Sequence, residues 1–265
     1  MHETTPTVHL LASPRIELSG VRAYLEEVGG SSWLDLREAE RREAQGGASD
    51  GELLIELAGR ACYRSWEPGL NPNVTRIRTD RKAYFANILA SGHGSVLEHA
   101  SYTFALHNVS RVATHEIVRH RAGSAFSQES LRYVRLSDIG FRVAPALAPL
   151  RERVLAIVEQ LEELQRQGAA ELGIDQEGVP FHVKKEVTSA LRRLAPIGLS
   201  TDIIWSANLR TLRHVIEMRT DPAAEEELRL IFDQVARIAS AQAPELFADF
   251  TRGDDGAWRP ANHKV

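Results

Sequence analysis

The stretch that decides the fold and function of this chain is Arg119–Tyr133, with the sequence RHRAGSAFSQESLRY. It begins with a cationic Arg-His-Arg triplet at the end of a helix-like run, and Gly123 then breaks the helix. A loop of small hydroxyl and amide residues leads to a Ser-Leu-Arg-Tyr exit. Three arginines, three serines and a glutamine within fifteen residues are costly to bury unless a polar anion lies between them. The stretch therefore predicts a site for a phosphorylated ligand with a hydrogen-bonding base, with a solvated basic helix end as the alternative.

The composition limits where such an anion site can lie. The 265 residues carry a formal net charge of −4, and 43% are hydrophobic and 26% charged, which is typical of a soluble globular protein. Binding to nucleic acid or to a membrane surface needs a basic excess, so we expect neither, and any anion site must be local. No apolar run reaches the ~20 residues of a membrane span, and the start is no signal peptide. We therefore expect a cytoplasmic protein.

Hydrophobic periodicity predicts an α-rich α/β or α+β chain with its strands concentrated in the first half. No repeat or linker is visible, so we expect one domain over residues 1–265. Segment 43–51 is polar and glycine-rich, which predicts a loop. Strands or extended segments are expected at 8–12, 102–106, 133–136 and 141–143, and helices at 17–28, 53–62, 79–90, 112–121 (capped by Ser110), 150–164, 179–194, 209–219 and 223–241.

A metal site is not expected. His115 and His120 suggest a zinc-binding helix, but they are five residues apart. At ~100° per residue this places them ~140° apart around a helix, whereas ligands four apart share a face. His93 and His99 are six apart and fit no better. A surface pair of Glu116 with Arg119 or His120 explains these residues more simply.

Neither a covalent nucleophile nor a Rossmann cofactor site is predicted. Cys62 is the only cysteine, which excludes an internal disulfide. Its apolar helical context favours a structural role as a small buried side chain that fills space in the core. No G-x-S-x-G elbow is present. Gly92 and Gly94 lack the third glycine of the dinucleotide fingerprint and precede a strand instead of following one.

Other cationic and amide residues are spread along the chain, and each by itself is more often solvated than functional. One helix can carry Arg210, Arg213 and His214 on its solvent-exposed face. The remaining candidates from the residues alone are His93, Ser95, Arg192, Asn208 and Arg219.

Three motifs together resemble the flavin-dependent thymidylate synthases. The Arg-His-Arg triplet followed by Ser130-Leu131-Arg132 matches that family's R-H-R…S-x-R pattern. Gly92–His99 (GHGSVLEH) matches its G-H-x-S/T-x-x-E-H, and Asn208–Arg210 matches its N-x-R. Arg192 and Arg219 fall where the family keeps two nucleotide-binding arginines. The matches cover residues 92–219 in the right order.

The resemblance implies a fold, an activity and a set of partners. The fold would be a single helix-rich α+β domain with a small central, mostly antiparallel sheet. The enzyme would be a homotetramer that methylates deoxyuridylate at C5 without a cysteine nucleophile. FAD would be the cofactor, with NADPH and methylenetetrahydrofolate as co-substrates.

The resemblance also implies roles for individual residues. Arg219 would be catalytic, because a guanidinium that stabilises negative charge across the N3–C4 amide of uracil makes C5 nucleophilic, as an oxyanion hole does. The residues expected to contact FAD are His93, Ser95, Arg119, His120, Arg121, Asn208, Leu209, Arg210 and His214. The residues expected to hold the nucleotide are Glu116, Arg119, Gln128, Glu129, Ser130, Leu131, Arg132, Arg192 and Arg219.

The chain departs from the family pattern at three places, and the first two bear on the substrate. Eight residues separate Arg121 from Ser130, the less common of the family's two spacings. Glu116 replaces a glutamine and places a carboxylate near an anionic substrate, which is repulsive unless Arg119 or His120 neutralises it. Cys62 lies near where the family often has serine, and we interpret it as a tolerated small residue. The alternatives are therefore a flavin-dependent C5-methylase or hydroxymethylase of another pyrimidine nucleotide, and a non-catalytic nucleotide- or RNA-binding protein.

Overall fold

A four-stranded antiparallel sheet forms the middle of the molecule. The computed structural model describes residues 1–43 and 48–265. The sheet has the order β2 (Thr7–Ala12), β3 (Ser101–Ser110), β6 (Ser200–Asn208), β4 (Ser124–Gln128). In the central pair, Ser101 lies opposite Asn208. Two small pairs flank it, β1 (His2–Glu3) with β5 (Gly140–Phe141) and β7 (Phe250–Arg252) with β8 (Trp258–Pro260).

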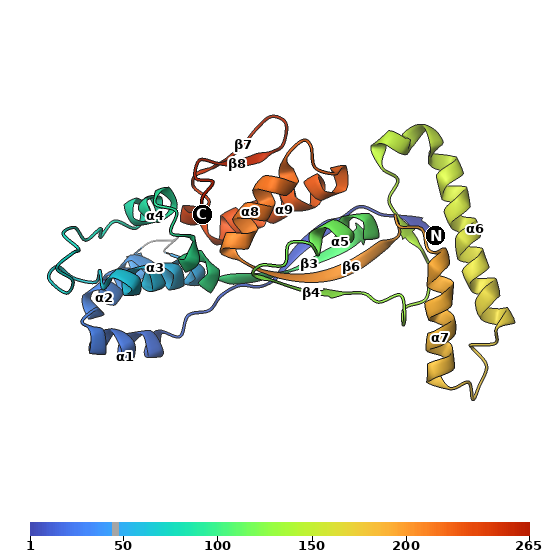
Figure 1. Ribbon diagram of the computed structural model, residues 1–265, viewed down its shortest axis with the longest axis horizontal. Coiled ribbons are helices and arrows are strands. Elements are labelled where there is room, and N and C mark those ends of the chain that lie inside the picture. Colours follow the sequence, from blue (N-terminus) through green and yellow to red (C-terminus); the bar gives the residue numbers. More distant parts are fainter. Residues whose placement is uncertain (44–47) are drawn as a thin grey trace.

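The main core lies between this sheet and the C-terminal helices. Helices α8 (Leu209–Thr220) and α9 (Glu226–Gln242) lie on the same side of the sheet as α5 (Arg111–Ile117) (Figure 1). The apolar alternation of β3 turns Tyr102, Phe104 and Leu106 into this core. Trp205 of β6 links sheet and helix, with ring centroids 5.9 Å from Phe104 and 5.6 Å from Phe232 of α9.

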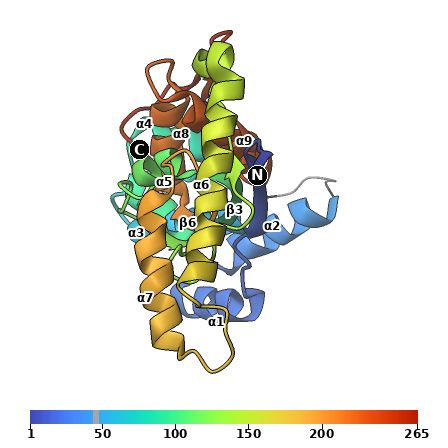
Figure 2. The same cartoon turned by 90° about the vertical axis from the view of Figure 1, so that its right-hand side faces the viewer.

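Helices occupy both ends of the sheet (Figures 1 and 2). At one end are α1 (Leu18–Val28), α2 (Ser31–Glu43), α3 (Asp50–Tyr63) and α4 (Arg81–Ala90). At the other end α6 (Arg151–Glu171) and α7 (Phe181–Leu191) lie side by side, as Figure 2 shows. Short 3₁₀ turns are η1 (Gly94–His99), η2 (Pro145–Leu150), η3 (Arg192–Leu194) and η4 (Pro244–Leu246).

The predicted α+β class with a small antiparallel sheet is confirmed, but the placement of the strands is partly wrong. β6, at the centre of the sheet, comes from the second half of the chain. β4 was expected to be a loop, and it is an edge strand held by backbone pairing to β6. Segment 133–136 is not extended, because the backbone N–H groups of Tyr133 and Val134 both bond to the Ser130 carbonyl in a turn.

The helices agree better with expectation, with three differences. The sequence did not indicate α2. The predicted 43–51 loop is too long, because Glu43 ends α2 and Asp50 begins α3; residues 44–47 lie outside the described residues. The helix that Ser110 caps ends at Ile117 instead of residue 121, because tighter turn bonds follow it. Cys62 is exposed and not a buried filler, since it lies on the outer face of α3. No helix in the described part of the chain is long and apolar enough to cross a membrane.

Candidate functional site

A cleft of about 660 Å³ opens at the N-terminus of α8. Four parts of the chain form it: Glu98 of η1, the turn between α5 and β4, α8 with its junction to β6, and residues 263–265. Its lining residues are Glu98, Arg119, His120, Arg121, Ala122, Gly123, Asn208, Arg210, Thr211, His214, Val215, His263, Lys264 and Val265. Six of the nine predicted FAD residues lie here.

Asn208 fixes the geometry of the cleft. Its side-chain oxygen caps α8 by accepting a 2.9 Å bond from the Thr211 N–H, and its own N–H donates to the Gly123 carbonyl at 3.0 Å. The Thr211 hydroxyl donates to the Ala122 carbonyl at 2.7 Å. Gly123 has a φ of +66°, and a Cβ there would lie 2.3 Å from the Asn208 amide nitrogen. Only glycine therefore fits, and the turn brings the Arg-His-Arg triplet to the positive end of a twelve-residue helix.

The cleft carries an excess of positive charge. Arg210 donates to Glu98 at 2.6 Å, and both side chains are about half exposed. Arg119, Arg121 and Lys264 are exposed and form no ion pair with a carboxylate of the described residues. One carboxylate side chain thus faces four cations, although the whole chain has a net charge of −4. Such a cleft, next to a helix N-terminus, is suited to an anion such as a phosphate or diphosphate.

Arg219 connects α8 to the Arg-His-Arg turn. Its Nε donates to Nε2 of His120 at 2.8 Å, and Nη1 donates to the Glu116 carboxylate at 2.6 Å. Burial, followed by the Arg219 cation, lowers the pKa of His120 to about 4. His120 is therefore neutral and accepts through Nε2. The sequence predicted that Glu116 pairs with Arg119 or His120. This prediction is wrong, because the ion-pair partner of Glu116 is Arg219.

A second open cavity, of about 600 Å³, adjoins the cleft. Arg219 lines it together with Glu217, Met218 and Asp221, and both His214 and His263 line this cavity as well as the cleft. The predicted catalytic arginine therefore lies beside the predicted cofactor site.

The remaining FAD candidates lie around the cleft without lining it. Ser95 is exposed on η1, and His93 packs edge-on against Tyr63 with ring centroids 5.5 Å apart. Between them, Gly94 approaches Arg210, where a Cβ would lie 2.8 Å from Nε. The Leu209 side chain is fully buried in the main core, and its backbone N–H donates to the Ala100 carbonyl at 2.8 Å.

Most of the predicted nucleotide residues lie at the far end of β4. Gln128 donates to the Thr114 hydroxyl at 3.1 Å. The Glu129 carbonyl accepts a 2.9 Å bond from Arg111, a residue that the sequence did not single out. Leu131 is buried. Ser130 and Arg132 lie in the turn that follows β4, where the Arg132 N–H donates to the Ser130 hydroxyl. Because β4 advances ~3.3 Å per residue, it separates this group from the cleft.

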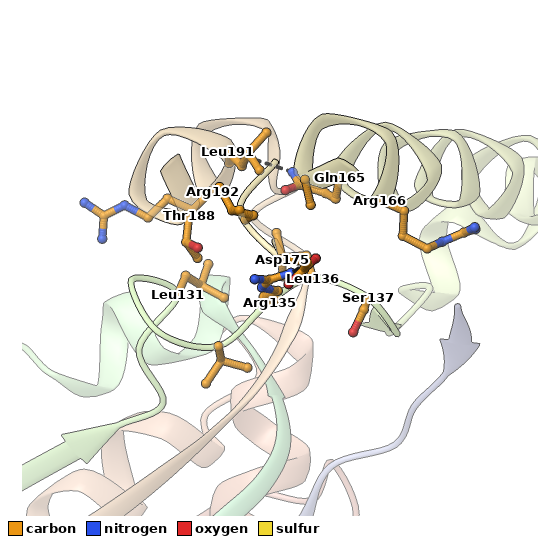
Figure 3. A pocket seen from close by; sticks show the side chains of 13 residues that line it. Leu131, Arg135, Leu136, Ser137, Gln165, Arg166, Asp175, Thr188, Leu191 and Arg192 are labelled. Carbon is orange, nitrogen blue, oxygen red and sulfur yellow. Dashed lines mark hydrogen bonds and ion pairs between the residues drawn. The ribbon is translucent and has the colours of Figure 1, made fainter. Parts of the chain in front are cut away.

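Leu131 and Arg192 also line a smaller cavity of about 190 Å³ between α6, α7 and the 131–137 loop (Figure 3). The guanidinium of Arg192 points away from the other labelled side chains in this view. One chain therefore brings Glu116, Arg119 and Arg219 to the cleft region, but not the rest of the predicted nucleotide set.

Sequence reasoning missed two features near the cleft. Arg213 was expected on the solvent-exposed face of α8. Its side chain is only 3% exposed, and it donates hydrogen bonds to both carboxylate oxygens of Asp249. His263 and Lys264 line the cleft from the C-terminal segment, and no motif marks them.

Fold and site together define an α+β protein with a cationic cleft at a helix N-terminus. The family model described as thymidylate synthase complementing protein matches residues 47–245. Proteins named flavin-dependent thymidylate synthase are similar over most of the chain. Those of Mycobacterium marinum and Mycobacteroides abscessus are each 37% identical, over 208 and 209 residues, or 77% of this chain and 81% of theirs. That of Mycobacterium tuberculosis is 36% identical over 208 residues, with the same coverage.

The chain therefore belongs to the thymidylate synthase complementing protein family. The resemblance that the Arg-His-Arg, Gly-His and Asn-x-Arg motifs predicted is confirmed.

Proposed function

We propose that the chain is a flavin-dependent thymidylate synthase that methylates deoxyuridylate at C5 to give thymidylate. Membership of the family supports an enzyme of thymidylate synthesis with a flavin cofactor. The observation that carries the proposal for this chain is the cleft in which Arg119, Arg121 and Arg210 surround the capped N-terminus of α8.

The residues of the cleft fit FAD. Its diphosphate carries two negative charges, and the exposed guanidinium groups of Arg119 and Arg121 offer the charge-assisted donors that such a group requires. The cleft also has the size of a typical cofactor site. FAD reduced by NADPH would supply the reducing equivalents, and methylenetetrahydrofolate would supply the carbon.

In this proposal the protein positions the nucleotide and stabilises charge. Arg219 would bind the uracil N3–C4 amide and hold the negative charge that makes C5 nucleophilic. Neutral His120 accepts from Nε of Arg219, which fixes the plane of the guanidinium without adding a second positive charge. Glu116 accepts from one N–H group of Nη1, so the nucleotide must compete with this carboxylate or bind the remaining N–H groups of Nη1 and Nη2.

We infer that a second copy of the chain completes the site. The nucleotide candidates Gln128–Arg132 and Arg192 lie at the end of β4 away from the cleft, so one chain does not enclose a nucleotide between both groups. A homotetramer with residues of different subunits at each site, as the resemblance implies, would bring them together.

A second candidate function has specific support. The longer loop between Arg121 and Ser130, together with Glu116, alters the region where the base is expected to bind. Both features favour testing uridylate and deoxycytidylate as alternative substrates. A non-catalytic RNA-binding role has weaker support, since the chain has a net charge of −4 and no basic excess.

Release of tritium from C5-labelled deoxyuridylate tests the main proposal. We expect release only when FAD, NADPH and methylenetetrahydrofolate are all present. No release from a protein that is yellow and bleached by NADPH would retain the flavin site and reject deoxyuridylate as substrate. A protein that stays colourless with added FAD would reject the flavin enzyme altogether.

A further inference from the structure

The C-terminal segment is held in place by a buried ion pair. Arg213 of α8 donates to the two carboxylate oxygens of Asp249 at 2.8 and 2.9 Å, and its side chain is 3% exposed. The same carboxylate accepts from the backbone and side-chain N–H groups of Asn262 at 3.1 and 2.9 Å. Because Asn262 is fixed to the core in this way, the next residues are directed to the cleft. They lie beyond residue 245, where the family match ends.

Contacts on both sides then fix residues 263–265 as a wall of the cleft. His263 bonds through Nδ1 to Glu217 of α8 at 2.6 Å. On the other side, a Cβ at Gly92 would lie 3.5 Å from Cβ of Lys264, and one at Gly94 would lie 3.0 Å from the carbonyl carbon of Val265. The Gly-His-Gly sequence therefore leaves room for the C-terminal segment.

Lys264 adds a cation to the cleft that is free to bind a ligand. Its side chain is exposed, and no carboxylate of the described residues pairs with it. It lines the cleft together with Arg119, Arg121 and Arg210, and among residues 1–43 and 48–265 only Arg210 of these three has an ion-pair partner. An ammonium group on a flexible stem is a common point-charge partner of phosphates.

We propose that residues 263–265 form one wall of the flavin-binding cleft and that the ammonium group of Lys264 binds the diphosphate of FAD. This inference rests on the proposed flavin function. It extends the cofactor site to a segment that lies outside the family match. The buried Arg213–Asp249 pair then has a role in positioning Lys264 as well as in stability.

Equilibrium binding of FAD and of riboflavin, which has no phosphate, tests the proposal by fluorescence. We expect Lys264→Ala to raise the Kd of FAD about tenfold (~1.4 kcal/mol) and to leave the Kd of riboflavin unchanged. Lys264→Arg should retain most of the FAD affinity. Lys82→Ala is the matched control, since Lys82 is exposed on α4 and does not line the cleft.

The outcomes separate this inference from the proposed function. If the unmodified protein does not bind FAD, the proposed function itself fails. If that protein binds FAD and Lys264→Ala binds it equally well, Lys264 makes no contact with the diphosphate and the inference is overturned. An equal loss of FAD and riboflavin affinity would overturn the contact between Lys264 and the diphosphate, because Lys264 would then contribute only to the shape of the cleft.

Discussion

Nε of Arg219 donates a 2.8 Å hydrogen bond to Nε2 of His120, which requires His120 to be neutral. Arg219 is near the end of α8, and His120 lies in the turn that follows α5. The bond thus joins the predicted catalytic residue to the centre of the Arg-His-Arg triplet. Two motifs that are 99 residues apart in sequence form one structural unit.

The neutrality of His120 predicts a pH dependence of stability. Its pKa is about 4 in the folded chain, because burial and the Arg219 cation disfavour the charged form, and about 6.5 when unfolded. Between these values the unfolded chain binds more protons, so the free energy of unfolding decreases as the pH falls from 6.5 to 4. His120 is only partly buried, so we expect a loss of about 1–2 kcal/mol from this group.

Urea unfolding at pH 7.5 and 4.5 measures this effect. His120→Gln should lose about 1–2 kcal/mol less than the unmodified chain between the two pH values. An identical loss in both proteins would show that His120 titrates normally.

Arg219→Ala should abolish most turnover and leave the flavin bound. Removal of one group that stabilises developing charge lowers kcat about 10²–10³-fold. Arg219 lines the adjoining cavity and not the cleft, so the Kd of FAD should change little. Tritium release and flavin fluorescence measure the two effects. Arg219→Lys keeps the positive charge but not the planar set of guanidinium donors, and it should recover part of the rate. Turnover that survives in Arg219→Ala would refute the role of Arg219 in activating uracil.

Glu116→Gln should strengthen nucleotide binding. The carboxylate occupies Nη1 of Arg219 and repels an anionic substrate, whereas an amide has no charge and is the residue usual in the family. We expect the KM for deoxyuridylate to fall about 3- to 10-fold, or 0.7–1.4 kcal/mol. Glu98→Gln, assayed with saturating FAD, is the control because Glu98 pairs with Arg210 instead. A raised KM in Glu116→Gln would mean that the ion pair is needed to orient Arg219.

Part of the motif residues that the sequence identified line the cleft, whereas Ser130, Arg132 and Arg192 lie at the far end of β4. The Arg-His-Arg triplet, Asn208 and Arg210 could be predicted because each carries polar chemistry at a helix end. The strand β4 could not, because Ser124–Gln128 has no apolar alternation and is held by backbone bonds to β6. The partners of Glu116 and Arg213 could not either. Both pairs join segments distant in the chain, and helical spacing indicates only neighbours within one helix.

Gly123→Ala should disrupt the cleft by two separable effects. A φ of +66° disfavours any L side chain, and the new Cβ would lie 2.3 Å from the amide nitrogen of Asn208. Gly69 also has a positive φ, of +93°, but nothing lies within 4 Å of its Cβ position. We expect Gly69→Ala to cost about 1 kcal/mol and Gly123→Ala about 2–4 kcal/mol, with weaker FAD binding only in the latter. Equal costs would mean that the Asn208 cap shifts without strain.

Arg213→Met should be strongly destabilising, whereas Arg210→Met on the same helix should not. The Arg213 side chain is 3% exposed, and its removal leaves the Asp249 carboxylate buried without its cation. Breaking a buried pair in this way costs about 3–5 kcal/mol. Arg210 is 44% exposed, and loss of its pair with Glu98 should cost less than about 1 kcal/mol. Urea unfolding of both variants at pH 7.5 measures the difference, and a small loss for Arg213→Met would show that the C-terminal segment is held by its apolar contacts instead.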